Sequence, residues 1–272
     1  MVHDHAACVP FPCHWIIPMR PTLLALAAAA LFVSLPAHAQ QGGPEDPRGW
    51  SAGIGAAWSP SAYRSYRNRA WPVPTFAYEG ERFFVRGPGV GYRLVDGNGF
   101  DLNAVVSLHP QRYRAKDARD AQLRQLDDRD FSAVAGLDAR WRGPWGTVGA
   151  SLKTDVTGHG GGLVGDLNYA YPLPSGRVTW IPIVGVEYAS ADMNDYYYGI
   201  DAREAARSGL DRYQAGSSLS PYVSISARIQ VTPRWTATVG VRALRLDGEV
   251  TDSPMVGRST ATGYLASLNY DF

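Results

Sequence analysis

The sequence predicts an all-β fold, a transmembrane antiparallel up-and-down β-barrel of about 12 strands with short periplasmic turns and long extracellular loops. Three observations lead to this prediction. The C-terminal segment alternates between apolar and polar residues and stops on an aromatic residue, the N-terminus carries an export signal, and the breaks between strands alternate between short and long. The predicted location is therefore the outer membrane of a Gram-negative type of cell.

The last nine residues form an alternating strand. Successive side chains of a strand point to opposite faces. One face therefore holds Tyr264, Ala266, Leu268, Tyr270 and Phe272, and the other holds Leu265, Ser267, Asn269 and Asp271. The first face suits lipid and the second suits water. The last strand of a soluble sandwich could show the same alternation, so the decision rests on the rest of the chain.

The N-terminus reads as a secretory signal peptide. Arg20 precedes an apolar run from Leu23 to Val33, and the small-x-small sequence Ala37-His38-Ala39 follows it. The run is shorter than the roughly 20 residues that a membrane-spanning helix needs. We therefore predict an upstream extension and cleaved signal peptide over 1–39, a periplasmic segment over 40–49 and a barrel over 50–272. Met19, directly before Arg20, is an alternative start.

Both cysteines lie in the segment that is predicted to be removed. Cys8 and Cys13, with His3, His5 and His14 beside them, match no zinc-ligand spacing, so we predict neither a metal site nor a cofactor. The formal net charge of +1 argues against nucleic acid as a partner. No later apolar run is long enough for a spanning helix, which leaves strands as the membrane-crossing elements.

Period-2 alternation recurs along the chain. Clear cases are the segments from Phe100 to His109, from Phe131 to Arg142, from Thr147 to Val156 and from Val223 to Thr232. Their polar faces carry charges such as Asp138 and Lys153. Together with the breaks, the alternation predicts strands over 50–58, 72–78, 82–86, 89–95, 99–109, 129–142, 146–157, 162–171, 178–189, 218–231, 234–247 and 259–272.

The breaks decide between a barrel and a soluble sandwich. Every second break is a short turn of Gly, Pro, Asn or Asp type, and the four long breaks all fall in the other set: 59–71, 110–128, 190–217 and 248–258. Short turns on one side and long loops on the other are typical of outer-membrane barrels. Residues 82–95 could instead be one bulged strand, which would give an odd strand count.

Three further features fit the same prediction. Seven tryptophans near strand ends suggest interfacial belts, although aromatic residues are common in strands anyway. The mixed charges of 110–130 read as a solvated loop, with lipopolysaccharide phosphates as an alternative ligand. Asp201 and Glu204 have the spacing of a capping box and Gly209 offers a stop, so a short helix over 202–208 is predicted in the loop 190–217.

Several stretches of the chain carry distinctive motifs. The earlier half contributes Phe83-Phe84-Val85 and Gly89-Val90-Gly91-Tyr92. The C-terminal third is more specific, with Tyr196-Tyr197-Tyr198-Gly199-Ile200, Glu204-Ala205, Ser208-Gly209-Leu210, Tyr213-Gln214-Ala215-Gly216, Asp252-Ser253-Pro254-Met255-Val256 and Tyr270-Asp271-Phe272. Together these stretches resemble the MipA/OmpV family of outer-membrane proteins. The resemblance implies a scaffold that links murein hydrolases to murein synthases, or a porin-like protein. It offers no catalytic motif to carry over.

Three function classes follow. A structural or scaffold barrel in murein maintenance is preferred, with outer-membrane lipid around it and a murein hydrolase and synthase complex as partner, and a channel for small solutes is the alternative. A lipid-modifying enzyme is less favoured, because the histidines after the signal, His109 and His159, lack the His-x-Ser-Asn pattern of a barrel phospholipase. We therefore predict no enzyme and no catalytic, cofactor-binding or metal-binding residue. The oligomeric state stays open.

Overall fold

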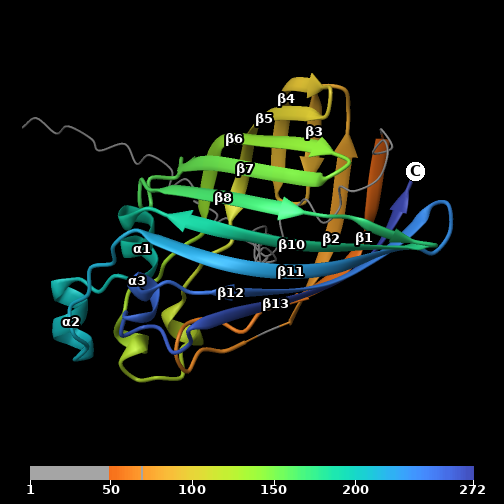
Figure 1. Cartoon of the computed structure of the whole chain (residues 1–272). Coiled ribbons are helices and arrows are strands. Elements are labelled where there is room, and N and C mark those ends of the chain that lie inside the picture. The colour runs from red at the N-terminus through yellow and green to blue at the C-terminus, as the bar shows by residue number, and fades with distance from the viewer. Residues whose placement is uncertain (1–48, 69) are drawn as a thin grey trace, which may run out of the picture.

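The computed structural model of the chain describes residues 49–68 and 70–272. The predicted signal peptide over 1–39 and residues 40–48 of the predicted periplasmic segment lie outside this part of the chain. The described residues form one continuous antiparallel sheet that closes on itself (Figure 1).

The sheet is a closed barrel with twelve positions in its wall. β1 pairs with β13 and β10 pairs with β11, which leaves no free edge at either end of the strand order. β9 occupies the same wall position as β8, because both pair with β10. The strands are β1 (Gly49–Trp58), β2 (Ala70–Glu79), β3 (Phe83–Arg86), β4 (Gly89–Gly97), β5 (Phe100–His109), β6 (Ser132–Gly143), β7 (Gly146–Asp155), β8 (Leu163–Ala170), β9 (Leu173–Ser175), β10 (Val178–Ala189), β11 (Ser218–Gln230), β12 (Trp235–Arg245) and β13 (Thr260–Asp271).

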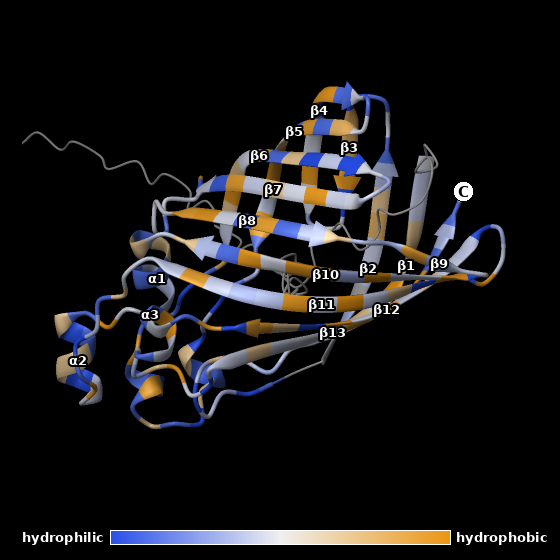
Figure 2. Cartoon of the chain, in the orientation of Figure 1, coloured by the Kyte–Doolittle hydropathy of each residue, from blue (hydrophilic) through white to orange (hydrophobic). Residues whose placement is uncertain are grey.

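The two faces of the sheet have opposite chemistry, as the alternation predicts. Large apolar side chains on the outside are exposed, for example Ile54 at 73%, whereas polar side chains on the inside are buried, for example Thr238 at 2%. The alternation is visible as bands of colour along the strands in Figure 2. An apolar outer face suits lipid, so the surface agrees with an outer-membrane barrel.

The two ends of the barrel differ. The long loops gather at one end and carry α1 (Ala191–Tyr198), α2 (Ala202–Ser208), α3 (Gly248–Thr251) and the single turns η2 (Ala115–Asp117) and η3 (Leu123–Gln125). The short turns and the C-terminus lie at the opposite end (Figure 1). This is the predicted arrangement of an extracellular and a periplasmic end. None of the helices in the described part of the chain is long and apolar enough to cross a bilayer.

Most predicted boundaries hold, and the differences have local causes. The split of 82–95 into two strands is confirmed, with a register shift between Arg93 and Val95 in β4. β6 begins at Ser132 rather than at 129, because Arg129 forms an isolated bridge with Tyr113 in the loops. The predicted strand over 162–171 ends at Ala170 and resumes as β9. The helices α1 and α3 are additions to the prediction.

Tryptophans lie near the strand ends at both ends of the barrel, where the predicted interfacial belts would place them. Trp50, Trp141, Trp145, Trp180 and Trp235 lie in or beside strand ends at the periplasmic side, each between 39% and 58% exposed. Near the other end, Trp58 packs against Tyr264 with ring centroids 5.2 Å apart. Amphipathic rings at headgroup depth are expected of such belts.

A glycine on the inner face of β6 provides a test of the wall. A Cβ atom at Gly136 would lie 2.1 Å from the carbonyl oxygen of Leu152 on β7. We expect Gly136→Ala to lower the free energy of unfolding by about 1–3 kcal/mol, the range for overpacked sites. The change in the free energy of unfolding is measured by urea unfolding, with the heat-modifiable gel shift reporting the folded fraction.

The matched control is Gly97→Ala in β4, where a Cβ would meet no atom within 4 Å. Equal stability of the two variants would contradict the close approach of β6 and β7.

Candidate functional site: a capped lumen

The lumen contains a cavity of about 1270 Å³. Its walls come from β1, β2, the β3–β4 hairpin, β5–β8 and β10–β13, and its upper end is lined by Tyr63, Met193 and Tyr197 from the long loops. Elsewhere the lumen is filled: Ile181, Ile183 and Tyr222 form a small buried cluster on the β8–β11 side. The barrel therefore holds a large chamber in part of its interior.

Charged residues of both signs face this lumen, as predicted, and most form ion pairs. Asp138 binds Arg140 at 3.3 Å, Glu187 binds Arg242 at 2.7 Å, and Asp101 binds Arg142 at 2.6 Å. Tyr222 donates a hydrogen bond of 2.9 Å to the carboxylate of Asp166. Buried charge is costly unless it is paired, so these pairs are what the polar interior requires.

The register confirms that Asp138 and Lys153 are diagonal neighbours. Asp138 lies opposite Ser151, and Lys153 lies opposite Gly136, one inward-facing position further along each strand. Both residues line the cavity. The ion pair that the structure gives Asp138 joins it to Arg140 on its own strand. A barrier made of lumen charges therefore includes Arg140 as well as the predicted pair.

The long loops fold over the mouth of the barrel as a compact cap. Its apolar core is a cluster of fourteen buried residues. Tyr63 and Tyr113 pack edge to face with centroids 4.9 Å apart, and Tyr63 donates a hydrogen bond of 3.2 Å to the carbonyl of Tyr197. Leu123 and Met255 are fully buried within the cluster. These loops are thus a second hydrophobic core, outside the membrane-spanning wall.

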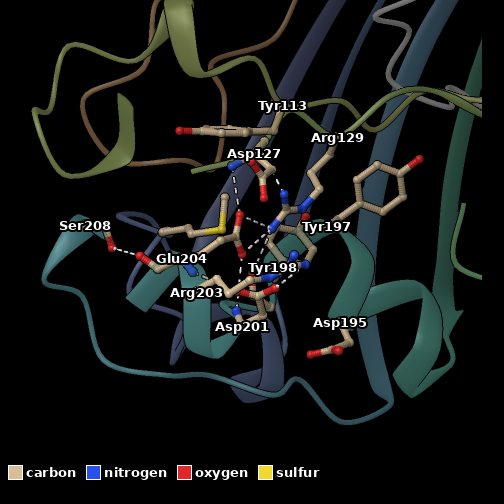
Figure 3. A network of polar contacts seen from close by, with 12 residues as sticks. Tyr113, Asp127, Arg129, Asp195, Tyr197, Tyr198, Asp201, Arg203, Glu204 and Ser208 are labelled. Carbon is tan, nitrogen blue, oxygen red and sulfur yellow. Dashed lines mark hydrogen bonds and ion pairs between the residues drawn. The ribbon is translucent and has the colours of Figure 1, made fainter. Parts of the chain in front are cut away.

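A buried ion pair links the cap loops to one another (Figure 3). Arg129 donates to both carboxylate oxygens of Glu204 at 2.9 and 2.8 Å, and their side chains are 10% and 3% exposed. Glu204 also accepts a hydrogen bond of 2.8 Å from the backbone of Asp127. The pair joins the loop between β5 and β6 to helix α2 between β10 and β11.

The same glutamate completes the predicted capping box of α2. Asp201 accepts a hydrogen bond of 2.7 Å from the backbone N–H of Glu204, and Glu204 accepts one of 3.2 Å from the backbone of Asp201. Gly209 ends the helix with φ of 71°, which is the left-handed cap. The hydrogen bond from the Glu204 N–H lowers the pKa of Asp201. Burial raises the pKa of Tyr63, Tyr113, Tyr197 and Tyr198, which stay neutral donors in the cap.

The two histidines take structural positions. The His109 ring lies 5.5 Å from the Tyr197 ring, and His159 is stacked on Tyr196 at 5.6 Å while one ring nitrogen lies 3.0 Å from the carbonyl of Phe131. Within residues 49–68 and 70–272, no three His, Cys, Asp or Glu side chains are grouped in a way that could hold a metal ion.

The prediction of a solvated loop over 110–130 is wrong for part of that segment. Tyr113, Leu123 and Arg129 are buried in the cap, and Arg114 pairs with Asp128 at 2.8 Å. The sequence carries a signal for this packing: a loop with Tyr113, Leu123 and Leu126 among its charges has apolar side chains to bury. The partners lie in other loops, which local patterns do not identify.

Comparison with known proteins gives a consistent family match. The family model described as MltA-interacting protein MipA matches residues 52–272. The MltA-interacting protein of Escherichia coli K12 is 36% identical over 81% of this chain and 88% of its own length, and the outer membrane protein OmpV of Vibrio cholerae is 25% identical over 82% and 86%. Among solved structures, the translocator domain of the autotransporter NalP from Neisseria meningitidis aligns with a TM-score of 0.47 and 13% identity, covering 84% of this chain and 90% of that one.

The cap can be opened selectively. Glu204→Ala leaves Arg129 buried without its carboxylate, and breaking a buried pair in this way costs about 3–5 kcal/mol. We expect the loops to become sensitive to trypsin at Arg119 and Arg124, while the barrel keeps its heat-modifiable gel shift. The time course of cleavage by mass spectrometry measures the effect.

Arg203→Ala is the matched control, because Arg203 precedes Glu204 on α2 and its side chain is 88% exposed. Equal cleavage rates in the two variants would show that the Arg129–Glu204 pair does not hold the cap together.

Proposed function

The chain belongs to the MltA-interacting protein family MipA, and from that membership we propose that it anchors a murein lytic transglycosylase to the outer membrane through the periplasmic end of its barrel. The protein itself is an outer-membrane β-barrel of the MipA/OmpV type. The observation that carries the proposal is the relative in Escherichia coli that is named for its interaction with MltA and matches this chain along most of its length.

The docking surface in this proposal is the rim of short turns. The opposite end is occupied by the folded cap, and an enzyme that works on murein reaches the barrel from the periplasm. At the rim, the backbone N–H of Phe272 donates a hydrogen bond of 3.0 Å to the carbonyl of Trp50, so the start of β1 and the C-terminus lie side by side there. Arg82, Arg177 and Arg234 are exposed on three of its turns.

The rim turns alone make a small surface. Stable interfaces bury about 800 Å² per partner. Residues 40–48, which the sequence predicts to be periplasmic, directly precede β1 in the chain and are proposed to add to the contact. The exposed arginines favour an acidic surface on the partner, and charges at a rim act chiefly on the association rate and its salt dependence.

Binding of a purified lytic transglycosylase to the barrel in lipid nanodiscs tests the proposal. We expect retention above the level of an unrelated outer-membrane barrel. Arg82→Glu combined with Arg177→Glu reverses two rim charges and should slow association by roughly tenfold at low salt, as measured by surface plasmon resonance.

Arg203→Glu, a charge reversal on the exposed side of the cap, is the control and should leave association unchanged. Retention no greater than that of the unrelated barrel would exclude anchoring, and an equal loss in the control would exclude the rim as the docking surface.

A small-solute channel is the second candidate, because the lumen holds a cavity of about 1270 Å³ whose lining includes charged residues of both signs. Barrels of this size lie between the small ones that side chains fill and the wide porins. In this function Asp138, Arg140 and Lys153 form an electrostatic barrier within the lumen. Ions would have to cross this barrier as well as the cap.

Replacing Asp138 and Lys153 by alanine should raise ion leakage several-fold in planar bilayers, because two charges leave the barrier. A matched double variant, Asp96→Ala with Arg177→Ala, removes charges at the periplasmic rim, outside the cavity, and should leave conductance unchanged. Unchanged leakage in the lumen variant would contradict the barrier.

A further inference from the structure

The barrel wall has a gap beside β2. β2 pairs with β1 along its whole length, but with β3 only from Ala77 to Glu79. The chain turns at Gly87 and Pro88 into β4, which pairs with β5 from Gly89 onward. In the described part of the chain, the segment of β2 before Phe76 therefore has no strand on this side.

The sequence of β2 is adapted to a free edge at this place. The carbonyl of Phe76 accepts a hydrogen bond of 3.0 Å from Gly87, so the backbone groups of Phe76 face β3. Those of Pro74 and Pro72 face the same side, since they lie two and four residues away. Proline has no N–H to donate, and within sheets it occurs chiefly on edge strands, at the first residue of a strand or at bulges. The two prolines thus fall where no partner strand is needed.

The lumen cavity continues through the gap to the outer surface. Its lining includes Phe76, Val90, Val106 and Leu108, which point outward and are between 39% and 52% exposed, as well as the lumen charges. Pro74 lies opposite Ile54, in the middle of β1, and the gap extends from there toward the cap. It therefore opens at the level of the outer leaflet. Unpaired backbone at membrane depth is tolerated where it lines a water-filled cavity.

A row of residues behind the gap ends at a lysine. The strand registers place Phe84, Gly91, Val105, Gly136 and Lys153 in one row from β3 to β7. The ring of Phe84 covers Gly91, and Phe84, Val105 and Lys153 line the cavity. Of the residues that line the cavity, seven are Arg or Lys and four are Asp or Glu. Arg86 is paired with Glu79, which lies outside the lining, and the remaining basic residues still outnumber the acidic ones, so the lining has a net positive formal charge.

We propose that this gap is a lateral opening through which a long-chain carboxylate enters the lumen from the outer leaflet and binds with its head group at Lys153. The apolar frame of Phe76, Val106 and Leu108 contacts the chain as it leaves the lipid. The row from Phe84 to Val105 then holds the chain beside the wall. Pockets for drug-sized ligands occupy about 300–1000 Å³, so a chamber of about 1270 Å³ has space for a single acyl chain.

Photo-crosslinking with a diazirine-bearing dodecanoate tests the site. The full chain is placed in phosphatidylcholine nanodiscs, and adducts are mapped by mass spectrometry. We expect adducts at Phe84 and Val105 inside the lumen, in addition to those on the lipid-facing wall. The corresponding dodecanol probe should give about tenfold fewer lumen adducts, since it lacks the charged hydrogen bond. Adducts on the outer face alone, or equal labelling by the alcohol, would overturn the proposal.

Lys153→Gln should lower lumen labelling by the carboxylate about tenfold, to the level of the alcohol. Arg177→Gln, the same kind of change at a periplasmic turn, is the control and should have no effect. Folding of both is checked by the heat-modifiable gel shift. If Lys153→Gln does not fold, the comparison of the dodecanoate and dodecanol probes on the unchanged protein still tests whether the lumen binds the carboxylate. Full labelling in a folded Lys153→Gln variant would overturn the assignment of the head group.

The route is tested by blocking the opening. With Cys8 and Cys13 replaced by serine, Leu108→Cys at the frame and Leu152→Cys on β7 are each labelled with a bulky maleimide. Both leucines face outward, at 39% and 56% exposure. Blocking position 108 should abolish lumen adducts and blocking position 152 should not. Equal lumen labelling of both would show that the carboxylate does not pass through the gap.

Discussion

Hydrogen bonding of the backbone in a medium without water is the constraint on which the structure depends. Every peptide N–H and C=O at membrane depth needs a partner within the protein or in a water-filled space, so a sheet that spans a bilayer has to close. Here the closure lies between β1 and β13, the first and last strands. The alternating C-terminal segment is therefore the last piece of the wall, and its apolar residues complete the outer face.

Closure of the wall determines that the interior of the barrel is polar. Because side chains alternate along the strands, an apolar outer face of lipid-facing residues puts most polar positions of the strands into the lumen. The buried charges then require partners, and Asp138 with Arg140 and Glu187 with Arg242 supply them. The polar residues of the lumen are thus a consequence of a wall built for lipid.

The parts of the fold that depend on local patterns are predictable from the sequence. Period-2 alternation gives the strands and their faces, the short turn at Pro144 gives the register that makes Asp138 and Lys153 diagonal neighbours, and a capping box gives α2. The cap is different, because its core joins residues far apart in the chain. Tyr63 contacts Tyr113 and Tyr197, and Arg129 contacts Glu204, across loops whose order no period encodes. The predicted start of β6 at residue 129 is wrong for the same reason: Arg129 pairs with Tyr113 in the cap, so the strand begins at Ser132.

The gap beside β2 lies between these two cases. Pro72 and Pro74 indicate an edge strand from the sequence alone. The gap itself follows only from the structure, in which the short β3 leaves this part of β2 without a neighbouring strand. The cap and the gap also divide the possible routes into the chamber. A water-soluble ion that enters from outside meets the packed tyrosines and Met193 at the mouth, whereas an acyl chain that leaves the lipid meets the apolar frame of Phe76 and Leu108. A cap packed over the mouth is therefore compatible with lateral binding of an amphiphile but opposes the conduction of ions.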